Sequence, residues 1–220
     1  MTISSCVQNT SATGKFNKAK NSSREEVNGE IISQTGNVTV LKVWGTHKER
    51  GYAYGYLLGD KIREVYEGYI GYVFKPYIAK AKKAIKSNQL LKIEQDYLDE
   101  CKAIIEGMDA AGFNTKNFDY LDLLVANSFL DLRAIMGSDA EPNGCSSLMA
   151  WGEATNNEEL GGKSIITRNL DWSVSTKLIK NNIVLIHIPS EVDEQPWLSI
   201  GYIGHCGALS GTNQSGLSVF

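Results

Sequence analysis

At residues 142–150 the sequence reads PNGCSSLMA, and the character of the chain changes at this point. On the N-terminal side, apolar residues recur every three or four positions, as they do along one face of a helix. On the C-terminal side there is no segment with helical periodicity, and short runs rich in β-branched and aromatic residues predict strands. The sequence therefore predicts a helical front half followed by an antiparallel sheet that begins at Cys145.

Five strands are predicted on the C-terminal side, each as a short run bounded by turn residues. The first two form a hairpin, because the polar loop 152–162 joins them and its Asn- and Glu-rich tip belongs in solvent. The five runs are 146–151, 164–168, 183–188, 197–203 and 217–220.

On the N-terminal side, a helix is predicted to begin at Thr46, after a short strand at 38–43. Thr46 and Glu49 form a capping box, in which each side chain satisfies the free backbone N–H of the other residue. Glycines recur at four-residue spacing along this helix, at Gly51, Gly55 and Gly59. One helix face is therefore bare of side chains, and another element can approach it closely.

Two further helices are predicted before residue 142. Asn117 has the properties of an N-cap for a largely apolar, buried helix over 118–136, which Gly137 ends. The other helix is amphipathic and places Cys101 in the core. Its apolar positions are Leu90, Ile93, Tyr97, Leu98, Cys101, Ile104, Ile105 and Met108.

The overall composition narrows the classes of function. The chain has 220 residues, 42% of them hydrophobic, and a net charge of −3, so it can bury a substantial core. Its Lys and Arg residues are scattered, which argues against nucleic acid as a partner. No apolar run approaches the ~18 residues of a transmembrane segment, and no secretory signal is visible in 1–20. The compartment stays open, since a secreted or lysosome-like location would need a start further upstream.

Three segments follow from these changes along the chain: a flexible segment at 1–36, a helical segment at 37–144, and the start of a β-rich segment at 145–220. Of the four cysteines, Cys6 lies in the first segment, and Cys206 is predicted to be buried at a strand end. No Cys or His pair has metal-ligand spacing, so no metal site is predicted.

Cys145 has surroundings that suggest chemistry. A cysteine at the first position of a core strand can attack the carbonyl carbon of the glycine before it, and water can hydrolyse the resulting thioester. Glycine reduces crowding at that carbonyl. The freed α-amine, whose pKa is about 7.7–8.0 in simple peptides, can then act as the base for the thiol. The alternative is a small buried residue at a strand start, which is the more frequent case for an isolated Gly-Cys pair.

Arg168 and Asp171 stand at the end of the strand that is predicted to pair with the one beginning at Cys145, so both should lie close to it. An arginine can stabilise a thiolate, and an aspartate can accept hydrogen bonds from the new amine. The alternative interpretation is a structural salt bridge between Arg168 and Asp171.

Four stretches carry a resemblance to a known family: WGTHKERGYAYG (44–55), GCSSLMA (144–150), RNLDW (168–172) and GALSGTNQSGL (207–217). They resemble the N-terminal-nucleophile hydrolases of the choloylglycine-hydrolase superfamily. Its members include bile-salt hydrolases, acid ceramidase, N-acylethanolamine amidase and the acyl-CoA type of penicillin acyltransferase. The first stretch is also similar to the phospholipase B-like branch. The motif Arg-Asn-x-Asp after a Gly-Cys hairpin is fairly specific, and the stretches occur in the family's order.

The resemblance implies a fold and a set of roles. The fold is an α+β, four-layer αββα arrangement of two antiparallel sheets covered by helices. Residues 37–144 are then a helical prosegment, and residues 145–220 are the start of the β-rich catalytic domain, which is expected to be incomplete at the C-terminus. Cys145 is the nucleophile and, through its amine, the base. Arg168 holds the thiolate and the substrate, and Asp171 orients the amine. Asn213 matches the asparagine of the family's Gly-x-Asn-x-x-Gly-Leu turn and is interpreted as structural, while the oxyanion asparagine is expected beyond residue 220.

The implied reaction is autocatalytic cleavage of a zymogen between Gly144 and Cys145, followed by hydrolysis of a linear acyl amide or transfer of its acyl group. The substrate is a small acyl amide, as in lipid metabolism, no cofactor is implied, and the two cleavage products stay associated. A phospholipase B-like esterase with the same nucleophile and a catalytically silent scaffold are the alternatives. The three histidines, His47, His187 and His205, are interpreted as structural, because no papain signature surrounds Cys145.

Overall fold

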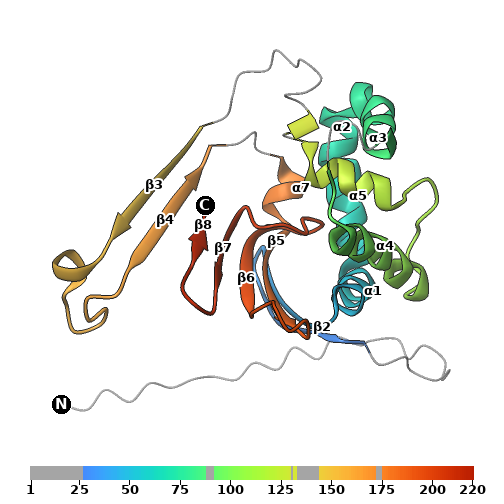
Figure 1. Cartoon of the computed structure of the whole chain (residues 1–220). Coiled ribbons are helices and arrows are strands. Elements are labelled where there is room, and N and C mark those ends of the chain that lie inside the picture. Colours follow the sequence, from blue (N-terminus) through green and yellow to red (C-terminus); the bar gives the residue numbers. More distant parts are fainter. Residues whose placement is uncertain (1–26, 88–91, 130, 133–143, 172–174) are drawn as a thin grey trace.

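The computed structural model describes residues 27–87, 92–129, 131–132, 144–171 and 175–220. They confirm the α+β class, with a six-stranded sheet, helices packed against one of its faces, and a separate two-stranded hairpin. Figure 1 shows this hairpin projecting away from the helices. Among the described residues, no helix combines the length and the apolar character needed to cross a membrane.

The strands are β1 (Gly29–Thr35), β2 (Val38–Gly45), β3 (Cys145–Ala150), β4 (Ile165–Leu170), β5 (Asn182–Pro189), β6 (Trp197–Tyr202), β7 (Ser210–Asn213) and β8 (Ser218–Val219). The α-helices are α1 (His47–Val65), α2 (Gly71–Val73), α3 (Ile78–Ser87), α4 (Gln95–Ala110), α5 (Tyr120–Asn127) and α7 (Thr176–Ile179). A π-helical turn (Tyr66–Ile70) and two 3-10 turns (Lys75–Tyr77 and Gly152–Thr155) complete the described elements.

The large sheet is mixed. Its strand order is β1-β2-β5-β6-β7-β8, in which β2 and β5 run parallel and the other neighbours are antiparallel. The prediction of an antiparallel sheet that begins at Cys145 is therefore wrong for the large sheet, because its strands β1 and β2 precede residue 142. Only the hairpin of β3 and β4 begins at Cys145. Alternation in 38–43 predicted a strand, but such a pattern carries no information about the strand's partner.

The strand β1 corrects the prediction that residues 1–36 are flexible. Residues 29–35 pair with β2, although six of the seven are exposed. An exposed edge strand buries little apolar surface, so its sequence lacks the hydrophobic pattern that would have predicted it. Residues 1–26 of the predicted flexible segment lie outside the described residues.

The predictions for α1 are confirmed. The Thr46 backbone N–H donates to Oε2 of Glu49 over 2.7 Å, and the Thr46 hydroxyl accepts from the Glu49 N–H, which completes the capping box. A Cβ added at Gly55 would lie only 1.9 Å from the carbonyl oxygen of Ile104, on α4. The bare glycine face of α1 therefore lets the backbones of α1 and α4 come into direct contact.

The boundaries of two helices differ from the predictions. The helix α4 begins at Gln95, so Ile93 precedes it, and Leu90 lies outside the described residues. The N-cap of α5 is Asp119 rather than Asn117, because the Asp119 carboxylate accepts from the N–H groups of the second and third helical residues. Asn117 instead adopts a left-handed conformation with φ of 58° in the preceding turn. The helix α5 ends at Asn127, and the predicted end at Met136 lies outside the described residues.

The five predicted strands are confirmed with ends that shift by up to two residues. Two elements after Cys145 were missed. The strand β7 lies in a Gly- and Ser-rich stretch that lacks β-branched residues apart from Thr212, and α7 is a single turn of four residues. Neither element is long enough to show a period in sequence.

Candidate functional site

Cys145 is the first residue of β3, opposite Leu170 on β4, and its side chain is exposed. The alternative interpretation, a small residue buried at a strand start, is therefore wrong. Cys101 and Cys206 are buried, as predicted. Among the described cysteines, only Cys145 presents its thiol to solvent.

The Arg168 side chain contacts the Cys145 thiol. Arg168 precedes the partner of Cys145 by two residues, so both side chains emerge on the same face of the hairpin. One terminal nitrogen, Nη2, lies 3.3 Å from the sulfur of Cys145. The other, Nη1, donates to the Ser210 hydroxyl over 3.1 Å and to the carbonyl oxygen of Leu209. The guanidinium thus links the hairpin to the start of β7 while one nitrogen stays on the thiol.

Asp171 lies beside the peptide bond that is predicted to be cut. Its backbone N–H donates to the carbonyl oxygen of Gly144 over 3.2 Å, which extends the pairing of β3 and β4 by one step. Its carboxylate accepts a hydrogen bond from the Asn169 side chain over 2.5 Å. The other carboxylate oxygen lies 4.0 Å from where a Cβ on Gly144 would stand. Among the described residues, no Arg168–Asp171 ion pair is found, so the structural salt-bridge alternative is not supported.

Asn213 closes the turn between β7 and β8. Its side-chain oxygen accepts from the backbone N–H of Leu217 over 2.9 Å, and its own N–H donates to the Leu217 carbonyl over 3.0 Å. Gly216 in the same turn has φ of 84°, a conformation that favours glycine. These hydrogen bonds lie within the turn rather than at the thiol, and they fit the structural interpretation of Asn213.

The hairpin exposes large apolar side chains along its length. Leu148, Met149 and Trp151 are 63%, 52% and 65% exposed. They lie a few residues from Cys145, on the two faces of the same strand and just past its end. The thiol therefore stands next to apolar surface that the described residues leave uncovered.

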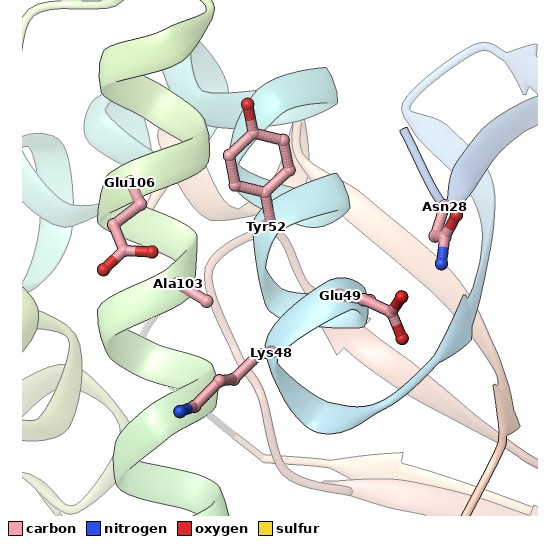
Figure 2. A pocket seen from close by; sticks show the side chains of 6 residues that line it. All are labelled: Asn28, Lys48, Glu49, Tyr52, Ala103 and Glu106. Carbon is pink, nitrogen blue, oxygen red and sulfur yellow. The ribbon is translucent and has the colours of Figure 1, made fainter. Parts of the chain in front are cut away.

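A pocket with a volume of about 240 Å³ lies away from this site, between α1, α4 and the start of β1. Figure 2 shows Glu49 and Asn28 on the side of β1, and Glu106 on α4. Glu49 already serves the capping box, and Lys48 forms an ion pair with Asp99 at 3.4 Å. The lining residues are Asn28, Lys48, Glu49, Tyr52, Ala103 and Glu106, which all precede Cys145 in the chain.

His47 belongs to an ion-pair network that the sequence did not reveal. Its two ring nitrogens lie 2.9 Å from Glu100 and 2.6 Å from Glu194. Arg50, which is 1% exposed, bonds Glu194 at 3.0 Å and Glu191 at 2.8 Å. The hydrogen bond to Glu100 raises the pKa of His47 to about 9, although burial lowers it. The histidine therefore carries a positive charge at neutral pH.

Three residues of this network carry atoms that can bind a metal ion. His47, Glu191 and Glu194 each place one ligand atom within 4.8 Å of the others. However, both ring nitrogens of His47 already bond carboxylates, and both glutamates pair with Arg50. The arrangement is therefore that of an ion-pair network, because a protonated histidine has no lone pair for a metal.

The other two histidines also have structural surroundings. His187 is 1% exposed and stacks on Trp197 with ring centroids 3.9 Å apart. Burial lowers its pKa to about 3, so the ring is neutral. A ring nitrogen of His205 lies 3.0 Å from the Gly207 carbonyl oxygen. Among the described residues, no histidine hydrogen-bonds with Cys145, which agrees with the absence of a papain-like pair.

No model of a protein family matches the chain. The chain is similar to protein dcd1B of Dictyostelium discoideum, with 25% identity over 211 residues that cover 90% of this chain and 41% of that protein. The chain thus spans about two fifths of the length of this relative. The likeness extends to both sides of Cys145, and the relative's name states no activity.

Proposed function

We propose that the chain carries the nucleophile of a cysteine amidohydrolase or acyltransferase of the N-terminal-nucleophile type, activated by cleavage between Gly144 and Cys145. One observation carries the proposal. The sulfur of Cys145 lies 3.3 Å from the Arg168 guanidinium, and the backbone N–H of Asp171 donates to the carbonyl oxygen of Gly144, the residue before Cys145. A nucleophile, a positive charge and a hydrogen-bond donor to the carbonyl oxygen thus meet at one peptide bond.

The proposed self-cleavage begins when the Cys145 thiol attacks the carbonyl carbon of Gly144. The carbon–sulfur bond forms, the carbonyl oxygen takes on negative charge, and the N–H of Asp171 donates to that oxygen. The carbon–nitrogen bond then breaks, and the nitrogen of Cys145 takes up the proton that the thiol released and becomes an amine. Water hydrolyses the thioester, which leaves a carboxylate on Gly144 and a free thiol on Cys145.

Turnover would use the same groups on an external acyl amide. The α-amine takes the thiol proton, the thiolate attacks the acyl carbon, and the leaving amine departs with a proton. The Nη2 of Arg168 lies where the thiolate develops its charge. Asp171, held by Asn169, is the carboxylate available to the Cys145 ammonium. Water, or another acceptor, then releases the acyl group from the sulfur.

The two products of cleavage are expected to stay associated. β2 lies before the cut and β5 after it, and the two strands pair through all eight residues of each. Arg50, from the first product, keeps its ion pairs with Glu191 and Glu194 of the second. Because the Arg50 side chain is buried, breaking these pairs would leave a charge unsatisfied in the core, which is costly.

The four-layer αββα fold is part of the same proposal. The helices and the large sheet would supply one helical layer and one sheet. The hairpin, with its uncovered apolar residues Leu148 and Trp151, would begin the second sheet. The proposal places further strands over this surface and an additional oxyanion donor among them.

The test is amine release from a series of N-acyl amides with a chromogenic amine, compared with esters of the same acyl groups. The expected result is amide turnover with a thioester on Cys145 that mass spectrometry detects, and no turnover in Cys145→Ala. Cys145→Ser should turn over poorly, because a hydroxyl is far less ionised than a thiol near neutral pH. Turnover of esters alone would favour the phospholipase B-like alternative. Equal activity in Cys145→Ala would refute the assignment of the nucleophile.

A further inference from the structure

One stretch of the helical half, residues 68–93, differs from the rest of the chain in its charge. It holds six lysines and no acidic residue, whereas the whole chain has a net charge of −3. Lys82 is half-buried and forms ion pairs with Asp122 at 2.7 Å and with Asp119 at 3.2 Å. Four other lysines of the stretch are exposed and form no ion pair with a described residue: Lys75, Lys80, Lys83 and Lys86. The stretch therefore presents positive charge that the described residues do not neutralise.

The structure turns the lysines of α3 away from the core. Ala81 and Ile85 are buried in the core cluster, and α3 packs against α5. Since an α-helix has about 3.6 residues per turn, Lys83 and Lys86 point away from this buried face. Figure 1 shows α3 on the outside of the group of helices, on the side away from the six-stranded sheet. The two lysines therefore extend from the outer side of the helical half.

Large apolar side chains are exposed directly beside these lysines. Tyr72 and Val73, on α2, are 79% and 55% exposed, and Tyr77, immediately before α3, is 37% exposed. The Tyr77 ring packs on buried Phe74, with ring centroids 5.3 Å apart, so its position is fixed. In the described helical elements, Ile179 is the only other exposed large apolar side chain. Exposed apolar and unpaired positive side chains thus meet in one short segment.

We propose that this segment attaches the protein to the surface of an anionic lipid bilayer. The α2–α3 surface consists of Tyr72, Val73, Tyr77, Lys80, Lys83 and Lys86. Tyrosine is enriched at membrane–water interfaces, where its ring lies at the level of the headgroups. Lysines beside an anionic leaflet are attracted to it, and their long apolar stems let the ammonium groups reach the headgroups. The net charge of −3 opposes such binding, so only a local cluster of positive charge can hold the protein there.

Two other classes of partner fit the α2–α3 surface less well. A protein groove that grips amphipathic helices needs the apolar face of the helix, but Ala81 and Ile85 already bury that face of α3. Nucleic acid is recognised largely through arginine and through stacking on aromatic rings. Residues 68–93 contain no arginine, and the aliphatic Val73 has no planar ring on which a base can stack.

The test is sedimentation of the full chain with sucrose-loaded vesicles, made either of phosphatidylcholine alone or of four parts phosphatidylcholine to one part phosphatidylserine. The protein carries Cys145→Ala, so that turnover of lipid cannot change the vesicles. Binding is expected to the mixed vesicles and to be weak with phosphatidylcholine alone. It should fall steeply in ~1 M salt, where the Debye length is about 3 Å.

Paired variants separate the two contributions to binding. Lys83→Gln with Lys86→Gln should lower the affinity about 30-fold, because each lysine at an anionic surface contributes a factor of roughly five. Tyr72→Ser with Val73→Ser should lower it roughly tenfold at both salt concentrations, since burial of apolar surface is not screened. Both pairs are exposed, so neither should change the melting temperature.

The matched control is Lys116→Gln with Lys163→Gln, which removes the same charge from two exposed lysines outside the segment. It should bind as the parent does. An equal loss in the control, unchanged binding in the Lys83 and Lys86 variant, or no binding to the mixed vesicles would overturn the proposal. Binding of a DNA duplex, but not of vesicles, through the same lysines would also overturn it. Because Cys145 takes no part, these outcomes leave the proposed function standing, and vesicle binding by a chain without amidase activity would contradict that function alone.

Discussion

Replacement of Arg168 by alanine tests the proposed site at its best-defined contact. The side chain places Nη2 3.3 Å from the sulfur of Cys145, while Nη1 donates hydrogen bonds to the Leu209 carbonyl and the Ser210 hydroxyl. A hydrogen bond to a charged group contributes about 1.5–3 kcal/mol. If this bond forms fully in the transition state, its loss slows cleavage about 10- to 150-fold, since ~1.4 kcal/mol corresponds to a factor of ten. Arg168→Lys keeps the positive charge, but its single nitrogen replaces two that contact the thiol and the start of β7. We therefore expect a loss of cleavage rate between those of wild type and Arg168→Ala.

The assay follows the appearance of the two fragments with time by intact mass, in full-length protein whose folding is checked by thermal melting. Arg63→Ala is the matched control, because Arg63 also makes hydrogen bonds to Glu67 and to the carbonyl oxygens of Asn114 and Lys116 but belongs to α1. It should cleave at the wild-type rate. Wild-type cleavage in Arg168→Ala, or a loss that merely matches the unfolded fraction, would refute the assigned role.

Two further predictions concern stability. Gly55→Ala should destabilise the protein by about 1–3 kcal/mol in urea denaturation, because the added carbon would stand 1.9 Å from a carbonyl of α4. Gly71→Ala should have little effect, because the added carbon would lie 3.3 Å from the carbonyl oxygen of Tyr66, and equal stability of the two variants would contradict the backbone contact. The folded-state pKa of His47 is raised to about 9 from 6.5, so its contribution is fully present below pH 6.5 and is lost as the pH rises through 9. The difference in free energy of unfolding between wild type and His47→Gln should therefore shrink as the pH rises through that range. A difference that stays constant would contradict the assigned role of His47 in the ion-pair network.

Local signals in the sequence predicted the parts of the fold that depend on neighbours in the chain. The capping box of Thr46 and Glu49 spans four residues, and the glycine spacing of α1 reports directly on one helix face. The same holds for the hairpin, whose register follows from two adjacent strands. This register brings Arg168 and Asp171 to the two sides of Cys145, so the candidate site could be predicted as well.

Features that depend on distant residues could not be predicted in this way. The parallel pairing of β2 with β5 joins strands more than a hundred residues apart in the sequence, and the residue pattern within either strand does not predict which strand it pairs with. The anchoring of Arg168 by Leu209 and Ser210 has the same origin. At the start of α5, Asn117 and Asp119 are both good caps, and only the backbone geometry selects Asp119.

The most direct test of the account is N-terminal sequencing of the full-length protein after maturation, with the uncleaved Cys145→Ala variant as the control. The account predicts a second N-terminus that reads Cys-Ser-Ser-Leu-Met, matching residues 145–149. It also predicts that this terminus appears in step with amide-cleaving activity. A fully active protein in which the bond between Gly144 and Cys145 is still intact would contradict the central claim.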